Sequence, residues 1–304
     1  MIVVLAVLCL VDLWQVDKRY LNDGMFVPKS EREMPQQATA ADSQILNDKS
    51  LGYRVLNFST STFNDNTTSY FHKSIGGYHP AKLRRYQEMI DKYIAPEMQA
   101  AMREISAKGG NMAEIQGYKT FPVLNMLNAK YFILPMQDGT TVPLTNIHAQ
   151  GNGWFVDKID YVADANAEYA GVGRIDVRHE AVADQRFKSV LGGARANDST
   201  ATVKLESYAP NHLEYAVGSK NGGIVAFSEI YYPGWTATVD GNPVVIGRVN
   251  YILRALNVKA GQHKVVLDFH PSSVQTTETI AYIAIVILLL SIIGAGYLEW
   301  KRRK

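Results

Sequence analysis

The chain has 304 residues, 47% of them hydrophobic, which is enough for one large folded body or two ordinary domains. Its 31 basic and 29 acidic residues nearly balance, and the closing KRRK accounts for the small positive excess, so the body lacks the basic surface that nucleic-acid binding needs. Cys9 is the single cysteine and none of the seven histidines falls at metal-ligand spacing, so we predict no disulfide, no metal site and no cofactor.

The N-terminal stretch, residues 1–16, is apolar at first and contains Trp14, with Lys18 and Arg19 just beyond it. It is short for a transmembrane helix, and it lacks the basic start and the cleavage site of a signal peptide. A degenerate signal anchor, a short buried strand and the outer end of a transmembrane helix all fit. We favour the end of a helix, because aromatic and basic side chains mark the point where a helix leaves the bilayer. Residues 17–44 are polar and contain prolines, so we predict a linker.

Residues 45–153 are predicted to form an α/β subdomain. Residues 51–59 alternate as a strand does, and a loop with many aromatic side chains follows them. A second strand is predicted over residues 130–134.

Helices are expected between these strands. Pro80 is expected to begin the first, because proline is tolerated in a first helical turn, and Leu83, Tyr86 and Ile90 give it a buried face. Pro96 is expected to interrupt the pattern before a second helix that ends at Gly109-Gly110. The fold class predicted for the whole chain is therefore α+β.

Residues 154–278 change to short alternating segments separated by turn signals, which predicts a β-sandwich domain. Asp240-Gly241-Asn242-Pro243 is typical of a hairpin turn. The candidate strands are residues 154–162, 174–177, 201–207, 212–217, 222–229, 236–239, 244–246, 251–258 and 264–270.

Residues 279–298 read TIAYIAIVILLLSIIGAGYL, about the twenty uncharged residues that cross a bilayer as a helix. Residues 299–304, EWKRRK, form a basic tail with an interfacial tryptophan, and basic residues favour the cytoplasmic side. We therefore expect a cell-membrane protein, with the lipid bilayer as a partner. Its body is expected outside the cytoplasm and its C-terminus, up to Lys304, inside.

Two segments carry the candidate binding residues. The first runs from Ser69 to Tyr86, where His72 and Tyr78 flank a Gly-Gly pair and Arg84 and Arg85 open the expected helix. Tyrosine faces stack on sugar rings and arginine matches phosphate oxygens, so this segment fits a sugar or phosphate site. A tight turn with its aromatics packed beneath it is the competing interpretation, and the one we weight more heavily.

The second segment, Phe227 to Gly241, holds Glu229, Tyr232 and Trp235 around a Pro-Gly turn, with Arg254 two strands further on. These aromatics are candidates for lining a groove. The structural alternative, which we favour, is that Trp235 fills the core and Glu229 pairs with Arg254.

Taken together, SYFHKSIGGYHPAKLRRYQEMID, LNMLNAKYFI and the stretch FSEIYYPGWTATVDGNPVVIGRVNYILRALNVKAGQHKVVLDFHP resemble the bacterial membrane protein YfhO family. So does VDLWQVDKRYLN after an apolar helix. The resemblance implies a GT-C-like membrane glycosyltransferase that takes sugar from a polyprenyl-phosphate donor and places it on an envelope polymer. It implies that this chain corresponds to the C-terminal extracytoplasmic portion and last transmembrane helix. The membrane region and the first loop that carry the acidic catalytic residues have no counterpart here, so whether the chain is an enzyme stays open and no catalytic residue is assigned.

The leading function is therefore to assist binding of a polyprenyl-phosphate-linked sugar or an envelope glycopolymer acceptor. The alternative is a non-catalytic, membrane-anchored scaffold or carbohydrate-binding module of the cell envelope. A free-standing hydrolase ranks lowest, because no acid and base pair is recognisable.

Overall fold

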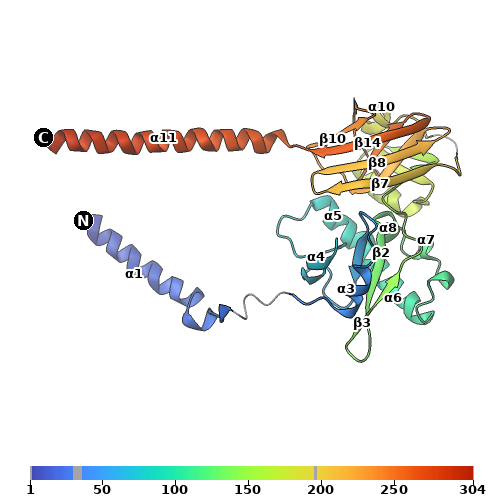
Figure 1. The fold of residues 1–304 in the computed structure, drawn as a ribbon, viewed down its shortest axis with the longest axis horizontal. Coiled ribbons are helices and arrows are strands. Elements are labelled where there is room, and N and C mark those ends of the chain that lie inside the picture. Colours follow the sequence, from blue (N-terminus) through green and yellow to red (C-terminus); the bar gives the residue numbers. More distant parts are fainter. Residues whose placement is uncertain (1, 30–35, 195–196, 304) are drawn as a thin grey trace. The chain divides into compact units, whose positions relative to one another are not determined.

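The computed structural model describes residues 2–29, 36–194 and 197–303, which form two compact units, Met1–Thr39 and Ala40–Lys304 (Figure 1). The first unit holds helix α1 (Ile2–Tyr20), none of whose residues is buried, and the short 3₁₀ helix η1 (Asp23–Met25). Part of the predicted linker, residues 30–35, and the terminal Lys304 of the basic tail lie outside the described residues. Helix α3 (Ala40–Ile45) begins inside the predicted linker.

The second unit contains helices and several sheets, which confirms the α+β prediction. Its first half has a three-stranded sheet in which β1 (Arg54–Asn57) runs parallel to β2 (Ala129–Pro135), and β2 pairs antiparallel with β3 (Thr141–Thr145). The helices that accompany this sheet are α4 (Thr67–Phe71), α5 (Arg84–Met89), α6 (Ala95–Ala107), η3 (Met112–Glu114), α7 (Gly117–Thr120) and α8 (Pro122–Met126).

Two predictions about these helices were wrong. Pro80 does not begin a helix: α5 starts at Arg84, and the amide N–H of Ala81 instead donates to His79 Nδ1 in a local turn that competes with helix formation. Pro96 does not interrupt the helix either. A π-helical segment, η2 (Ile90–Ile94), joins α5 to α6, and its wider turn accommodates the missing N–H of proline.

The second half is built from two antiparallel sheets. The five-stranded sheet has the order β11-β10-β14-β8-β7 and the four-stranded sheet has the order β12-β13-β9-β4. Their strands are β4 (Gly153–Val156), β7 (Thr202–Ala209), β8 (His212–Ser219), β9 (Gly223–Ile230), β10 (Trp235–Val239), β11 (Asn242–Val244), β12 (Gly247–Val249), β13 (Leu253–Val258) and β14 (Gly261–Phe269).

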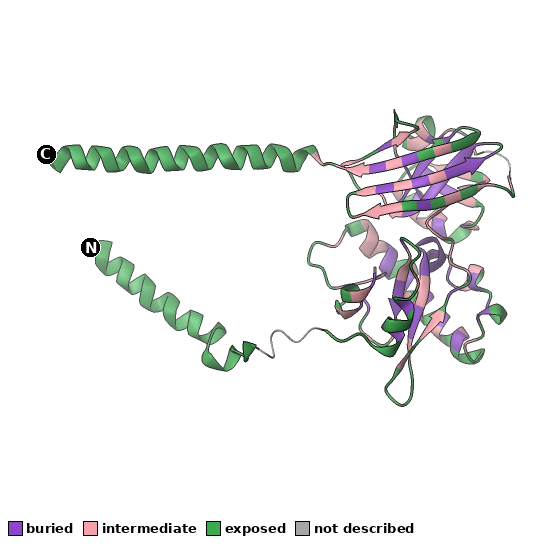
Figure 2. Ribbon diagram, viewed as in Figure 1, coloured by how far each residue is buried: buried purple, intermediate pink, exposed green. Residues whose placement is uncertain are grey.

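Alternate residues of both sheets share one apolar core (Figure 2). Val265 and Leu267 of β14 are fully buried there, as their period-two spacing predicts, together with Val225 and Phe227 of β9. Asp240 and Gly241 both have positive φ, which makes the predicted hairpin turn a tight two-residue connection between β10 and β11.

The strand predicted over residues 174–177 does not exist. The chain there forms the 3₁₀ helix η4 (Val172–Arg174) and a turn in which Asp176 accepts hydrogen bonds from the backbone of Arg178, His179 and Glu180. The strand begins only afterwards, as β6 (Glu180–Asp184), which runs parallel to β5 (Lys158–Val162). Helices α9 (Ala165–Gly171) and α10 (Lys188–Leu191), with the 3₁₀ helix η5 (Gln185–Phe187), complete this region.

The hairpin between β12 and β13 joins the two halves. At its tip Asn250 and Tyr251 both adopt left-handed φ angles of 51° and 70°, a costly conformation for non-glycine residues. Hydrogen bonds hold it: Asn250 exchanges bonds with the backbone of Val182, and the N–H of Tyr251 donates to Glu168. Beside the tip, Arg248 forms a buried ion pair with Glu168 at 2.6 Å.

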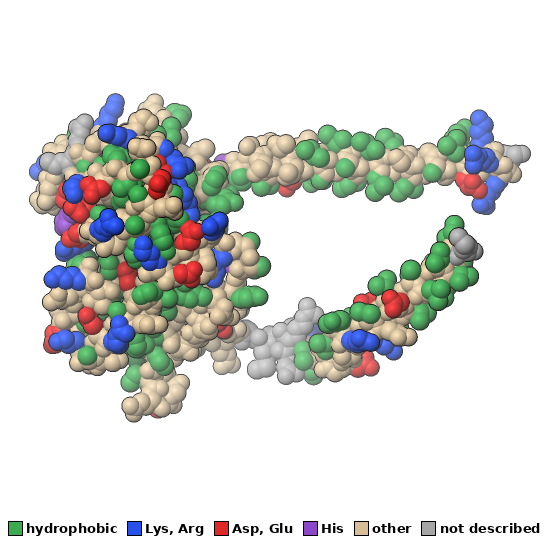
Figure 3. Space-filling model, turned by 180° about the vertical axis from the view of Figure 1, so that it is seen from behind, with side chains coloured by type: hydrophobic (Ala, Val, Ile, Leu, Met, Phe, Trp, Pro, Cys, Tyr) green, Lys and Arg blue, Asp and Glu red, His purple; other side chains and the backbone are tan. Residues whose placement is uncertain are grey.

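Helix α11 (Ser272–Arg303) follows β14 and is long and apolar enough to cross a membrane; it alone passes that test among the described residues. None of its residues is buried, and Figure 3 shows hydrophobic side chains along it and blue Lys and Arg side chains at its end. A helix of this composition without a protein partner along its surface is suited to lipid.

We predict that Glu168→Gln destabilises the body, because it leaves the buried Arg248 without its counter-charge. Removing one member of a buried ion pair costs about 3–5 kcal/mol. Thermal melts of the full chain in detergent, followed by circular dichroism, measure the loss. The double variant Glu168→Gln/Arg248→Met should recover part of it, since no unpaired charge remains. A single variant that melts like the parent would contradict this account of the hairpin.

Candidate functional site

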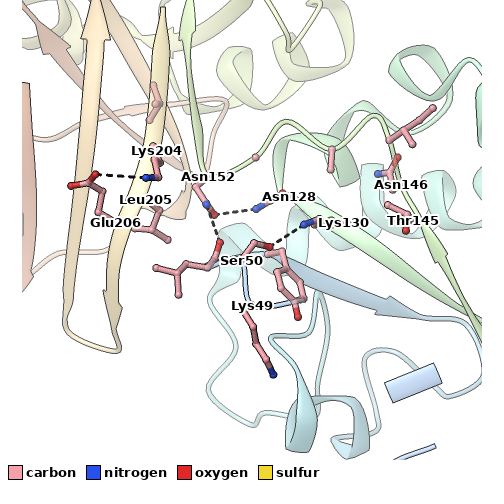
Figure 4. Close-up of a pocket in the computed structure, with 16 residues that line it drawn as sticks. Lys49, Ser50, Asn128, Lys130, Thr145, Asn146, Asn152, Lys204, Leu205 and Glu206 are labelled. Atoms are coloured by element: carbon pink, nitrogen blue, oxygen red, sulfur yellow. Dashed lines mark hydrogen bonds and ion pairs between the residues drawn. The ribbon is translucent and has the colours of Figure 1, made fainter. Parts of the chain in front are cut away.

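A cavity of about 790 Å³ lies between the two halves of the second unit, bordered by β7 and by the chain before β1 (Figure 4). Its size suits a ligand, but the side-chain amides of the asparagines that line it donate hydrogen bonds to other protein groups. Asn128 donates to Gly52 O and to Asn152 Oδ1, and Asn152 donates to Leu51 O. Lys130 is held by Asp48 at 2.6 Å and by Ser50 at 2.9 Å. Because these polar groups already have protein partners and hold the cavity walls in place, we place the candidate site elsewhere.

Two neighbouring cavities of about 320 Å³ each bring the two candidate segments of the sequence together. Tyr231, Tyr232 and Pro233, which follow β9, line both of them. The first, which we call the α5 cavity, is otherwise lined by Leu83, Arg84, Arg85, Tyr86, Ile230, Arg248 and Ile252. The second, the β10 cavity, is otherwise lined by Gly234, Trp235, Thr236, Ala237, Pro243, Val244, Val245, Ile246 and Arg254.

The arginines of the α5 cavity already have partners. Arg84 pairs with Glu88 one turn along the helix at 3.0 Å, and its side chain is 92% exposed. Arg85 lies over the ring of Tyr251, with 4.3 Å between its guanidinium carbon and the ring centre. Arg248 is neutralised by Glu168. This cavity therefore offers apolar walls with partly compensated charge, and its most available cation is Arg85.

The β10 cavity holds a cation of a different kind. Arg254 is only 4% exposed, its Nε donates to Ile230 O at 2.9 Å, and its guanidinium carbon lies 3.7 Å from the ring centre of Trp235. Its Nη1 atom is buried and has no hydrogen-bond partner among the described residues. A buried donor left unpaired costs free energy that a bound acceptor would recover. Burial lowers the pKa of Arg254 to about 10, so the group stays charged at neutral pH.

A cluster of charges lies behind Arg254. Glu229 pairs with Arg54 at 3.3 Å, and its negative charge also raises the pKa of Arg254 against the effect of burial. Lys73 lies over the ring of Tyr208, and burial lowers the pKa of its amine to about 8. Three cations thus surround one carboxylate, which leaves an excess of positive charge in a half-buried region. Such a region favours an anion.

The β10 cavity adjoins the start of the membrane-type helix, and the α5 cavity shares Tyr231, Tyr232 and Pro233 with it. The N–H of His270 donates to Gly234 O at 3.1 Å, and a Cβ on Gly234 would lie 2.9 Å from Pro271, the residue before α11. Gly234 has a φ of +98°, so the close approach and the backbone conformation both call for glycine. The Pro-Gly turn therefore fixes the β10 cavity next to the point where α11 begins.

The structure brings together five of the eight candidates: Arg84, Arg85, Tyr232, Trp235 and Arg254 line the two cavities. His72 does not; its side chain is buried and its Nε2 lies 2.9 Å from Asp42 Oδ1. Tyr78 is 67% exposed in the loop before α5. Glu229 pairs with Arg54 rather than forming the expected ion pair with Arg254. Trp235 is half-buried at the edge of the core, not inside it.

Sequence reasoning missed Arg54, Tyr231 and Arg248. Arg54 stands in the predicted strand 51–59 and Arg248 lies between two predicted strands; a charged residue at either place is ordinarily solvent-exposed, so no local signal marks them as enclosed by the fold. Tyr231 stands beside Tyr232 in the segment already selected. Within the described ranges, no group of three His, Cys, Asp or Glu side chains gathers as metal ligands.

The family model described as bacterial membrane protein YfhO matches residues 187–281. This confirms the resemblance over a segment that runs from Phe187 through Trp235, Arg248 and Arg254 into the first turns of α11. Comparison of the chain with curated proteins and with solved structures gives no match. The matched family model and helix α11 together support a membrane localisation.

We predict that Trp235→Ala lowers the free energy of unfolding by about 2–3 kcal/mol, somewhat less than the loss of a fully buried tryptophan. The ring contacts Phe269, at 5.3 Å between ring centres, and the guanidinium of Arg254, and both contacts disappear. Thermal melts in detergent test this, with Trp235→Phe as the control that retains most of the packing. An unchanged melting temperature for Trp235→Ala would mean that the ring serves a ligand and not the fold.

Proposed function

We propose that the body of this protein binds the phosphate-bearing headgroup of a polyprenyl-phosphate-linked sugar at the outer surface of the cell membrane. It would do so as the extracytoplasmic domain of a glycosyltransferase-like membrane protein. The observation that carries the proposal is the buried Arg254, which lines the β10 cavity and whose Nη1 is unpaired; Gly234 of the same cavity packs against Pro271, the residue before α11. A guanidinium in that state lacks an oxyanion, and phosphate oxygens match its planar donors.

The surroundings of Arg254 fit the rest of such a ligand. Tyr231 and Tyr232 line both cavities and offer aromatic faces on which a sugar ring packs. The α5 cavity continues from them with mostly apolar walls and with Arg85 at its edge. The ligand's lipid part would stay in the bilayer, because the β10 cavity adjoins the start of α11. The match to the membrane-protein family covers Arg254 and both tyrosines.

A non-catalytic scaffold or carbohydrate-binding module is the alternative, and the same experiment separates the two. A scaffold would bind polyprenyl phosphate no better than an uncharged polyprenol. A module that contacts only the sugar would bind a free glycopolymer equally well with or without the charge at position 254. No catalytic role is assigned to any residue of this chain.

We predict that Arg254→Gln weakens binding of a short-chain polyprenyl phosphate about 10- to 100-fold, the equivalent of a lost charge-assisted hydrogen bond of about 1.5–3 kcal/mol. Titration calorimetry on the full chain in lipid nanodiscs measures it. Arg178→Gln is the matched control, because Arg178 lines neither cavity and is already paired with Asp176, and it should change affinity less than threefold.

Arg254→Lys keeps the charge but loses the planar donors, so its affinity should lie between those of the parent and of Arg254→Gln. Melting temperatures of all three variants show whether they are folded. Unchanged affinity in a folded Arg254→Gln variant, or equal binding of uncharged polyprenol to the parent, would rule out the phosphate site.

We also expect the body to lie outside the cytoplasm and the basic tail inside, since Lys301, Arg302 and Arg303 end α11. In a Cys9→Ser background, cysteine at the exposed Ala260 should react with a membrane-impermeant maleimide on intact cells. Cysteine at Lys304 should react only after the cells are permeabilised. The reverse pattern would invert the topology and remove the proposed site from the outer surface.

A further inference from the structure

Exposed apolar side chains line the two cavities, and another stands in the loop that enters α5. Tyr232 is 46% exposed and Val245 is 67% exposed, and both line the β10 cavity. Leu83, which borders the α5 cavity, is 38% exposed, and Tyr78 in the loop before it is 67% exposed. Large exposed apolar residues that gather at one place on a surface mark a contact site.

These residues lie at one end of the body. Strand β14 runs from Gly261 to Phe269 and leads directly to Pro271 and α11. Trp235 pairs with Phe269 in the sheet, and the ring of Tyr232 lies 6.1 Å from that of Phe269. Figure 1 shows the loop that enters α5 on the same side of the body as the end of β14. The rim of the cavities is therefore the end of the body from which α11 departs.

The length of α11 fixes how far this end stands from lipid. The uncharged span begins at Thr279, so residues 272–278 separate it from Pro271. At 1.5 Å per residue they add about 10 Å of helix, and tilt shortens that height. The headgroup layer is itself roughly 5–8 Å thick on each side of the hydrocarbon. A tyrosine or valine on the rim thus comes within reach of the headgroups.

The basic residues beside these apolar side chains also suit contact with anionic lipid headgroups. Lys82 and Arg84 stand beside the exposed Leu83; Arg84 pairs with Glu88 through its Nε, and its side chain is 92% exposed. Tyrosine at the headgroup level with basic side chains around it is the composition of a membrane interface, where anionic lipids attract the cations.

We propose that this rim, formed by Tyr78, Leu83, Tyr232 and Val245, docks into the headgroup layer of an anionic lipid bilayer as a second contact besides α11. Docking holds the body against the membrane, and the two cavities open at the level of the headgroups. The contact does not depend on which ligand the cavities take.

The test uses the full chain, with Cys9→Ser, in vesicles that contain a phosphatidylglycerol-type anionic lipid and no polyprenyl phosphate. A fluorophore is attached to a cysteine at Tyr78 or Val245, and quenching by lipids with a nitroxide near the headgroup is measured. Ala260→Cys is the matched control: it is exposed and immediately precedes β14, about 30 Å from Phe269 at the opposite end of that strand. We expect several-fold stronger quenching at the two rim positions than at Ala260.

Equal quenching at all three positions would overturn the docking proposal. Adding Arg254→Gln to the labelled proteins should leave the rim quenching unchanged, since lipid contact does not use the buried guanidinium. Loss of rim quenching in that variant, while it remains folded, would also count against a docking surface that acts independently of the cavities. Failure of phosphate binding with intact rim quenching would refute the proposed function alone.

Discussion

The buried ion pair between Arg248 and Glu168 is the contact on which the cavity walls depend. It lies under the β12–β13 hairpin, whose tip keeps two non-glycine residues, Asn250 and Tyr251, in left-handed conformations. Strain of that kind, of order 1–3 kcal/mol per residue, persists only where surrounding bonds fix the backbone. Here the bonds come from β6 and α9, the segment between β4 and β7, so that segment fixes the shape of the hairpin.

The two strands of the same hairpin supply one arginine to each cavity. Arg248 on β12 is fully compensated, whereas Arg254 on β13 keeps an unpaired donor. The difference follows from their neighbours: one guanidinium has a carboxylate at 2.6 Å, and the other has a carbonyl and an aromatic face. Neither an indole nor a carbonyl neutralises a cation, so the second arginine retains its attraction for an anion.

Much of the sheet half could be predicted from sequence, because alternation and turn chemistry are local signals. The Asp240-Gly241 turn and the buried face of β14 follow directly from residue type. The helical half was less predictable. A π turn has no residue signature beyond Pro96, and the turn at His79 depends on one side-chain nitrogen.

The residues of the candidate site likewise divide into those that local sequence indicates and those that it does not. Aromatic and basic residues marked both segments as candidates, but their meeting at two cavities and the pairing of Glu229 with Arg54, 175 residues away, cannot be inferred from local spacing. His72 shows the converse: its residue type indicates chemistry, and its burial against Asp42 serves the fold.

The π turn at Ile90–Ile94 has a consequence for how the helix reaches the site. A π turn contains one more residue than the α-helical turn it replaces, and each residue rotates an α-helix by about 100°. The face that α5 presents is therefore out of phase with the face that α6 would continue. Arg85, on the α5 side of this phase shift, lies over Tyr251, so removing one residue from the π turn would rotate that guanidinium by about 100° relative to α6. One inserted residue thus sets the angle at which the surface of α5 faces the cavity relative to the surface of α6.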